Sequence, residues 1–240
     1  MTETTSFEAP GRLGSGRPRF YGQGLPYRQI GDLNGKLFVI EGPDRVGRST
    51  QARLLSEWLE SEGHAVMSTG FRRSGLTSAG LAQARMARNM HRITTSLFYA
   101  TDFADRLENQ IIPAMKAGFI CLSDRYIYTT FARDTVRGAD PEWLRRVYGF
   151  ALVPDVVLYL RVEVDDLVSR VISGGGFDFW ESGMDAGLAD NLYDSFRAYQ
   201  TRIIEQLDRM AEEYGFVTID ASRSVPEVFA DLKTEIARII

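Results

Sequence analysis

Short runs of consecutive apolar residues alternate along this chain with longer segments whose apolar residues recur every three or four positions. Five such runs predict strands: 37–40, 65–67, 119–122, 156–160 and 216–219. Because their apolar residues are mostly consecutive, we expect both faces of each strand to be covered. The segments between them predict helices. The order of elements therefore indicates an α/β fold, with a five-stranded, mainly parallel sheet and helices on both faces.

Local signals mark the ends of several helices. The first helical segment is followed by Gly63, which is placed to end it. Asp140 followed by Pro141 is typical of a helix start, because aspartate caps the free N–H groups and proline needs no donor there. Ser224 and Glu227 have the spacing of a capping box and predict the start of the last helix.

Residues 1–34 differ in composition from the rest, since glycine, proline and arginine are scattered through them. We expect the early part to be a flexible extension. Four apolar side chains are candidates to anchor its later part on the protein surface: Phe20, Tyr21, Leu25 and Tyr27. Residues 35–240 then form one domain of ordinary size.

Composition narrows the classes of function. The formal net charge of −4 gives no general reason to expect nucleic-acid binding. The single cysteine, Cys121, excludes an intrachain disulfide, and His64 and His91 lack metal-ligand spacing. No run approaches the roughly 20 apolar residues that a membrane span needs. The N-terminus has no apolar signal-peptide core, so we expect a cytoplasmic protein.

The strongest chemical signal is the run GPDRVGRST at residues 42–50, directly after the first strand and before a helix. Its glycines allow a tight turn whose N–H groups point at phosphate oxygens, and the helix N-terminus adds positive potential. Ser49 is positioned to hold a magnesium ion. This pattern predicts a P-loop NTPase fold with ATP and Mg²⁺ as cofactors. We assign eight nucleotide-binding residues: Gly42, Asp44, Arg45, Val46, Gly47, Arg48, Ser49 and Thr50.

Arg48 stands where a P-loop usually has lysine. Arginine keeps the positive charge, but its guanidinium is larger, planar and forked. We therefore expect phosphate binding, with Arg48 as one catalytic cation, while turnover depends on whether the loop accommodates the larger group.

With this loop and the segments below, residues 35–240 resemble thymidylate kinases. One subgroup of that family, typified by eukaryotic members, has an aspartate–arginine pair inside the loop, as Asp44 and Arg45 do here. The resemblance implies that Arg45 reaches the transferred phosphoryl group and that Asp44 contacts the substrate sugar. It implies a kinase that phosphorylates dTMP with ATP.

Three further residues are assigned from a second motif. Asp124, Arg125 and Tyr126 follow the third predicted strand and resemble the Asp-Arg-Tyr motif of the family. The resemblance implies that Asp124 acts near magnesium or the attacking phosphate and that Arg125 holds the acceptor phosphate. Ser49 and Asp124 are thus the expected metal ligands, and Arg125 and Tyr126 substrate contacts. Arg73, after the second strand, aligns with an arginine that contacts the bound monophosphate.

The segment 171–187 resembles the lid of these kinases. Three consecutive glycines, 174–176, suit a mobile flap. This segment contains no arginine or lysine, which agrees with the subgroup that carries its catalytic arginine in the P-loop.

The acceptor pocket departs from the family pattern. Arg133 and Asp134 stand where an aromatic residue and an amide help to hold the base. Phe98 aligns with the aromatic residue of a Phe-x-Ala-x-Arg helix, but Phe103 falls where its arginine is expected. Arg106, about one turn later, is a candidate replacement.

Two alternatives to dTMP phosphorylation follow from these departures. The acceptor could be another (deoxy)nucleotide or a deoxynucleoside, or the chain could be a catalytically silent nucleotide-binding protein. Thymidylate kinases are commonly homodimers, and by resemblance residues 78–117 are the expected interface. Nucleic acid and membrane are not among the expected partners.

Overall fold

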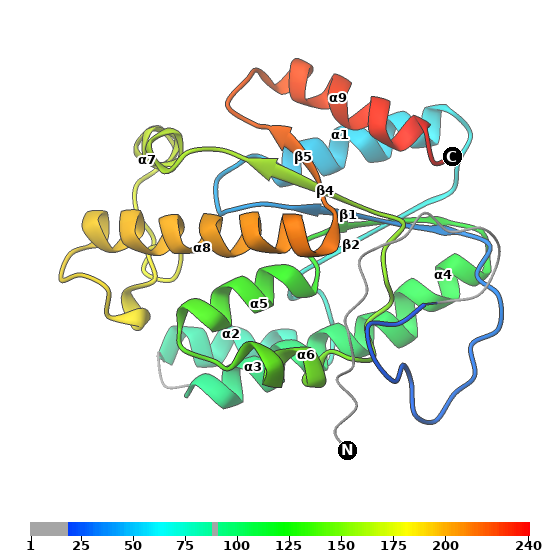
Figure 1. Cartoon of the computed structure of the whole chain (residues 1–240), viewed down its shortest axis with the longest axis horizontal. Coiled ribbons are helices and arrows are strands. Elements are labelled where there is room, and N and C mark those ends of the chain that lie inside the picture. The colour runs from blue at the N-terminus through cyan, green and yellow to red at the C-terminus, as the bar shows by residue number, and fades with distance from the viewer. Residues whose placement is uncertain (1–18, 88–90) are drawn as a thin grey trace.

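The computed structural model describes residues 19–87 and 91–240. Its centre is one five-stranded sheet, all parallel, in the order β2-β3-β1-β4-β5 (Figure 1). The strands are β1 (Lys36–Glu41), β2 (Val66–Gly70), β3 (Ile120–Asp124), β4 (Val156–Arg161) and β5 (Val217–Asp220). Each coincides with one predicted apolar run, so the predicted α/β class and sheet are confirmed.

Helices cover both faces of this sheet. The helices are α1 (Arg48–Ser61), α2 (Ser78–Ala87), α3 (Arg92–Arg106), α4 (Ile112–Lys116), α5 (Ile127–Val136), α6 (Pro141–Val147), α7 (Val164–Ser173), α8 (Leu192–Tyr214) and α9 (Val225–Ala237). A π-helical segment, Leu107–Ile111, joins α3 to α4, and a 3₁₀ turn, Met184–Ala186, precedes α8. Figure 1 shows α1 and α9 on one side of the sheet and α5 and α8 on the other.

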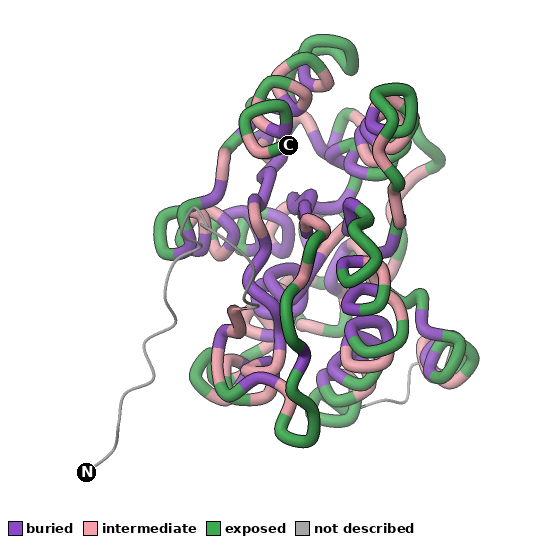
Figure 2. Tube along the Cα trace, turned by 90° about the vertical axis from the view of Figure 1, so that its right-hand side faces the viewer, coloured by how far each residue is buried: buried purple, intermediate pink, exposed green. Residues whose placement is uncertain are grey.

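The two faces of β1 explain its continuous apolar run. Leu37 and Val39 pack into the core beneath α5 and α8, whereas Phe38 and Ile40 pack into the core beneath α1 and α9. All four are fully buried, and the inner strands β1, β3 and β4 are buried at every position except one residue at an end of each (Figure 2). Side chains alternate between the faces of a strand, so a strand covered on both faces is apolar at most of its positions.

The predicted helix ends are also confirmed. Gly63 has a φ of 92°, and its N–H donates to the Glu60 carbonyl just beyond the end of α1. The side chain of Asp140 accepts a hydrogen bond from the Glu142 N–H at the start of α6. Ser224 forms the expected capping box at the start of α9.

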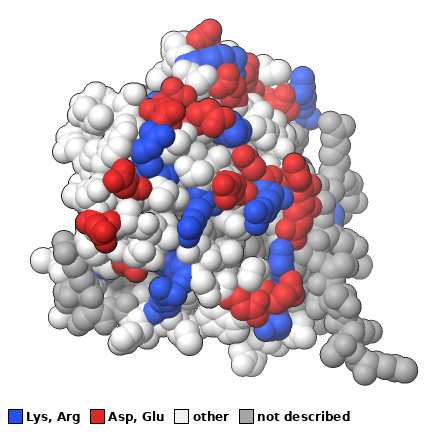
Figure 3. Space-filling model, turned by 60° about the vertical axis from the view of Figure 1, so that its left-hand side comes forward, with Lys and Arg blue, Asp and Glu red and all other residues white. Residues whose placement is uncertain are grey.

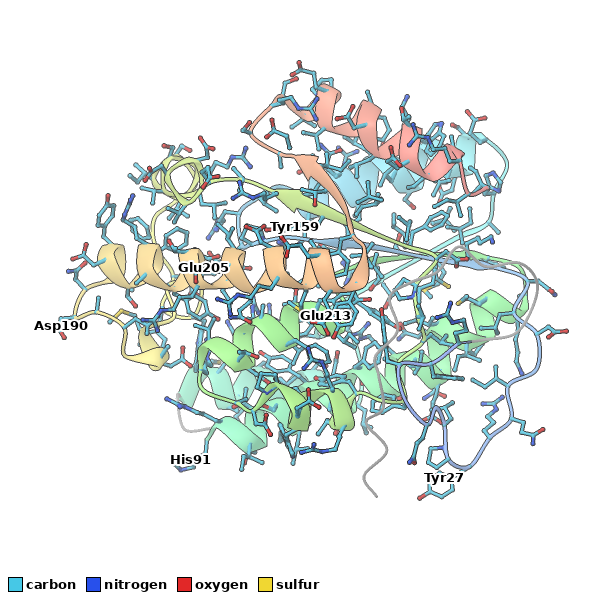
Figure 4. All side chains as sticks on the ribbon, viewed as in Figure 1. Tyr27, His91, Tyr159, Asp190, Glu205 and Glu213 are labelled. Carbon is cyan, nitrogen blue, oxygen red and sulfur yellow. The ribbon has the colours of Figure 1, made fainter. Side chains whose placement is uncertain are left out.

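The segment before β1 is anchored on the domain by aromatic side chains. Phe20 forms an isolated antiparallel bridge with Leu152. Tyr21 is buried, and its ring meets Tyr128 of α5 and Tyr214 of α8 edge to face. Tyr27, in contrast, is 98% exposed and points away from the protein in Figure 4, so it is not an anchor. The flexible extension was predicted for the early part of residues 1–34, and residues 1–18 of that stretch lie outside the described residues.

The carboxyl ends of β1 and β3 meet at the same edge of the sheet. Ile40 pairs with Asp124 in register, and the Arg125 N–H donates to the Ile40 carbonyl at 2.9 Å. This pairing brings the P-loop and the Asp-Arg-Tyr segment together, at the edge where open α/β sheets bind ligands.

None of the helices in the described part of the chain is both long and apolar enough to pass through a membrane. On the face shown in Figure 3, acidic and basic side chains are interspersed. That face therefore carries no broad field of one sign.

Candidate active site

The loop between β1 and α1 needs its two glycines for different reasons. Gly42 has a φ of 151°, and a Cβ there would lie 2.7 Å from the Leu160 carbonyl oxygen. Gly47 has open space around it but a φ of 102°, which L side chains rarely adopt. Arg45 also has a positive φ, 67°, although it carries a side chain. This backbone turns tightly and leads into the N-terminus of α1, as phosphate binding requires.

Arg48 is held inside this loop. Its side chain is 5% exposed, and one terminal nitrogen, Nη1, donates to both the Gly42 and Pro43 carbonyls. Its Nε donates to Oδ1 of Asp124 at 3.1 Å. The guanidinium therefore links the start of the loop to the end of β3. A lysine has one nitrogen at the end of a flexible chain and could not occupy all of these positions together.

Asp44 is the centre of a buried cluster of arginines. Both of its oxygens accept from Nη2 of Arg133 at 2.8 Å, and Arg125 donates to Oδ1. Arg48 lies 3.7 Å from the same oxygen. Burial alone would raise the pKa of Asp44, but Arg133, Arg125 and Arg48 together hold it well below its usual range. Asp44 is therefore ionised, and it partly neutralises three guanidinium groups.

Glu41 aligns α5 with the P-loop. It is fully buried at the end of β1 and accepts hydrogen bonds from the Tyr126 N–H at 2.7 Å and the Thr129 hydroxyl at 2.6 Å. Burial raises the pKa of Glu41, and the bonds from Thr129 and Tyr126 oppose that shift. Because these donors flank the start of α5, Glu41 orients the helix that carries Arg133.

The two expected metal ligands lie side by side. The Ser49 hydroxyl donates to Oδ2 of Asp124 at 2.8 Å. A hydroxyl and a carboxylate next to a phosphate-binding loop are ligands that Mg²⁺ accepts, together with waters and substrate phosphates. These side chains fit the predicted magnesium site.

A cavity of about 1050 Å³ lies next to the loop. Asp44 and Arg125 line it, as do Phe71 and Tyr99, whose rings are stacked with their centroids 4.6 Å apart. Its volume is at the upper end of the range for small-molecule sites, so a nucleotide fits. Six of the lining residues are arginines: Arg72, Arg85, Arg92, Arg125, Arg133 and Arg137.

The other predicted substrate contacts lie around this cavity rather than on its wall. Arg73 is exposed in the loop after β2, and Phe98 packs against Gly80 of α2. Tyr126 is 1% exposed, and its hydroxyl donates to the Leu152 carbonyl. The roles of these residues toward a substrate stay predictions.

Arg106, the proposed replacement for a family arginine, lies beneath the cavity wall. It is 1% exposed, and its Nε donates to Asp102 at 3.0 Å. Asp102 in turn accepts from the backbone N–H groups of Arg72 and Ser74 and from the Thr77 hydroxyl. Arg106 therefore acts in this structure by fixing Asp102, which shapes the loop after β2 that carries Arg72.

Sequence reasoning left two cavity residues without a role, although a signal for them was present. Arg133 and Arg137 follow Arg125 and Thr129 at intervals of four residues. This spacing places side chains on one face of a helix. Thr129 lies at the site through its bond to Glu41, so Arg133, one turn further along α5, and Arg137, directly after the last residue of α5, also reach the cavity.

Arg170 connects the P-loop to the turn that follows β5. Its guanidinium donates to the Val46 carbonyl at 2.9 Å and to the Ala221 carbonyl at 2.6 Å. The turn that contains Ala221 directly follows β5. One arginine of α7 thus joins the P-loop to that turn.

The sheet order, the P-loop after β1 and the adjacent cavity define the class of protein: an α/β P-loop kinase. Comparison with known proteins narrows this class. The family model described as thymidylate kinase matches residues 40–232. The chain belongs to the thymidylate kinase family, and it is a nucleoside-monophosphate kinase.

Several curated proteins are similar to this chain over most of its length. The chain is 37% identical to "Probable thymidylate kinase 2" of Saccharolobus solfataricus over 203 residues, which cover 84% of this chain and 95% of that protein. It is 31% identical to "Probable thymidylate kinase" of Thermococcus onnurineus, over 81% of this chain and 93% of that protein. "Thymidylate kinase" of Desulfotalea psychrophila is 35% identical over 59% of this chain and 71% of that protein.

Proposed function

We propose that this kinase transfers the γ-phosphoryl group of magnesium-bound ATP to dTMP, giving dTDP and ADP. The observation that carries the proposal is the cavity next to the P-loop, which is lined by both Asp44 of the loop and Arg125 of the Asp-Arg-Tyr motif. A nucleotide acceptor there would meet the loop that binds the donor phosphates. The similar proteins are named as probable thymidylate kinases, so dTMP is the first acceptor to test.

The chemistry needs positioning and cations rather than a strong base. An oxygen of the acceptor phosphate attacks the γ-phosphorus, and the bond from that phosphorus to the β–γ bridging oxygen breaks as ADP leaves. The acceptor phosphate is already anionic near pH 7, so no proton must be removed first. Arg45 and Arg48 stabilise the transferring group, Arg125 holds the acceptor phosphate, and Ser49 and Asp124 hold the metal. Magnesium bound there supplies positive charge to the phosphate oxygens.

A second candidate acceptor is a different nucleoside monophosphate. Arg133 favours this alternative, because its side chain lines the cavity at the position where the family has an aromatic residue. Arg133 also binds both oxygens of Asp44. An Asp44 carboxylate engaged in this way has less capacity to accept a hydrogen bond from a sugar hydroxyl.

The experiment that tests the function measures ADP release with ATP, magnesium and a panel of deoxy- and ribonucleoside monophosphates, with deoxynucleosides included. We expect dTMP to give the highest kcat/KM. Arg45→Ala and Asp124→Asn should each lower kcat by at least about 100-fold, because they remove a cation and a metal ligand from the transferring phosphate. Turnover with another acceptor would identify that one as the substrate. ATP binding without turnover on any acceptor would support a silent nucleotide-binding protein.

We also propose that the kinase is a homodimer that pairs through α2 and α3. The support is a set of exposed apolar side chains on and next to these helices: Leu76, Met86, Ile93 and Leu97. These four side chains lie within one stretch of the chain, and exposed apolar surface is typical of protein interfaces. Light scattering should therefore give twice the mass of one chain, and Leu97→Glu should give the mass of one. A single-chain mass for the unaltered protein would contradict the proposal.

A further inference from the structure

The second half of the lid segment is held in a defined conformation. Asp178 accepts hydrogen bonds from the N–H groups of Trp180 at 2.8 Å and Glu181 at 3.0 Å, which closes a tight turn. Gln200 of α8 donates to the Glu181 carbonyl at 2.8 Å. The backbone of Glu181 is therefore fixed at both its N–H and its carbonyl.

Two further contacts seat this turn on α8. Ser195 donates to the Ser182 carbonyl at 2.8 Å. Gly183, with a φ of 62°, approaches Tyr199 so closely that a Cβ would lie 2.3 Å from the tyrosine ring. Only glycine fits there. The Glu181 side chain thus projects from a rigid support, although it lies within a segment whose glycines suggested mobility.

The Glu181 carboxylate contacts the P-loop arginine. Nε of Arg45 donates to Oε2 of Glu181 at 2.7 Å, across 136 residues of sequence. Within residues 19–87 and 91–240, the two terminal nitrogens of Arg45 make no hydrogen bond. The carboxylate therefore binds only Nε, the guanidinium nitrogen nearest the backbone. The two terminal nitrogens of Arg45 are left to donate elsewhere.

This ion pair contributes little to folding. The two side chains are 35% and 30% exposed, and ion pairs that are open to water are weak. Its consequence is instead geometric, since Arg45 has four rotatable side-chain bonds and would otherwise sample many orientations above the loop. Because the turn that carries the carboxylate is already rigid, binding to it limits these orientations with little further loss of conformational entropy.

We propose that Glu181 is a positioning residue for the phosphoryl transfer: it binds Nε of Arg45 and so directs the terminal nitrogens towards the γ-phosphate. The inference rests on the proposed function, in which Arg45 contacts the transferred group. The opposite role, in which Glu181 holds Arg45 away from the phosphates, predicts effects of the opposite sign.

Calorimetry on the full chain separates these two roles. It measures the binding of ATP and of ADP, each with magnesium and without an acceptor. Because ADP lacks the γ-phosphate, an arginine aimed at that group strengthens ATP binding selectively. We expect Glu181→Ala to weaken ATP binding by about 10-fold and to leave ADP binding nearly unchanged. Glu181→Gln keeps an oxygen that can accept from Nε, so it should retain most of the preference for ATP.

A double variant tests whether Glu181 acts through Arg45. Once Arg45→Ala has removed the guanidinium, Glu181→Ala should cause no further loss of ATP affinity. In turnover assays with the best acceptor, Glu181→Ala should lower kcat more than it raises KM for ATP. Asp190→Ala is the matched control, because this exposed acid lies beyond the lid, does not line the cavity, and projects outwards from the molecule in Figure 4. It should leave both affinities unchanged.

Three results would overturn the inference. Tighter ATP binding or faster turnover in Glu181→Ala would show that Glu181 holds Arg45 away from the phosphates. If Glu181→Ala keeps the same preference for ATP over ADP, Glu181 pairs with Arg45 at the surface without positioning it. The proposed function would still stand in that case. If the unaltered protein binds no ATP, both the inference and the proposed function fail.

Discussion

Replacing Arg48 by lysine, the usual P-loop residue, is expected to lower kcat by about 100-fold rather than to improve the enzyme. The guanidinium donates to the Gly42 and Pro43 carbonyls and to Asp124 at once. Lysine would keep the charge but lose at least one of these bonds, and the loop that has formed around a planar group would retain a gap. Steady-state kinetics with the acceptor identified by the panel measures the change.

Arg53→Lys provides the matched control for this experiment. Arg53 lies on the exposed side of α1, and within the described residues its ion-pair partner is Glu57, one turn away. The same exchange there should leave kcat within about a factor of two, because exposed pairs of this kind are weak. A gain of turnover in Arg48→Lys would contradict our interpretation of the loop. It would indicate that Arg48 restrains an otherwise competent site, as expected for a silent nucleotide-binding protein.

Asp44→Asn is expected to destabilise the protein by about 3–5 kcal/mol, because it removes the carboxylate shared by Arg125, Arg133 and Arg48. The loss should lower Tm by roughly 10 °C for a chain of this size. It should also weaken acceptor binding, since Arg125 and Arg133 line the cavity and would lose their common partner. Thermal unfolding in a buffer without phosphate or sulfate measures the effect, because such anions could replace the carboxylate.

The pH dependence of this effect follows from the lowered pKa of Asp44. The unfolded chain takes up a proton at this aspartate near pH 4, while the folded chain does not, so the stabilisation is complete above that pH. It declines as the pH falls further. The difference in Tm between Asp44→Asn and the unaltered protein should therefore narrow below about pH 4. A difference that stays constant from pH 7 to pH 3 would contradict this account.

Glu57→Gln serves as the control for Asp44→Asn. Glu57 also pairs with an arginine, at 2.7 Å, but both side chains are about 60% exposed. Its removal should change the free energy of unfolding by no more than about 0.5 kcal/mol. Comparable losses in the two variants would show that burial of the Asp44 cluster is not the source of its effect.

The sequence alone determined the strands, the helix ends and the P-loop of this protein. These features depend on neighbours only a few residues apart: the apolar run 37–40, the capping pair Ser224 and Glu227, and the glycines that a tight turn requires. The order of elements then restricted the fold to a parallel sheet with covered faces, and the carboxyl ends of its strands met as expected.

Only the tertiary structure decided which side chains become partners. Arg133 meets Asp44 across 89 residues, and Arg45 meets Glu181 across 136. Arg106 looked like a substrate contact from its position, but Asp102 holds it beneath the cavity wall. An arginine can pair with any carboxylate that packing brings within reach, so its partner depends on how distant elements pack together. The local sequence shows which residues carry charge, and the fold selects the charges that meet.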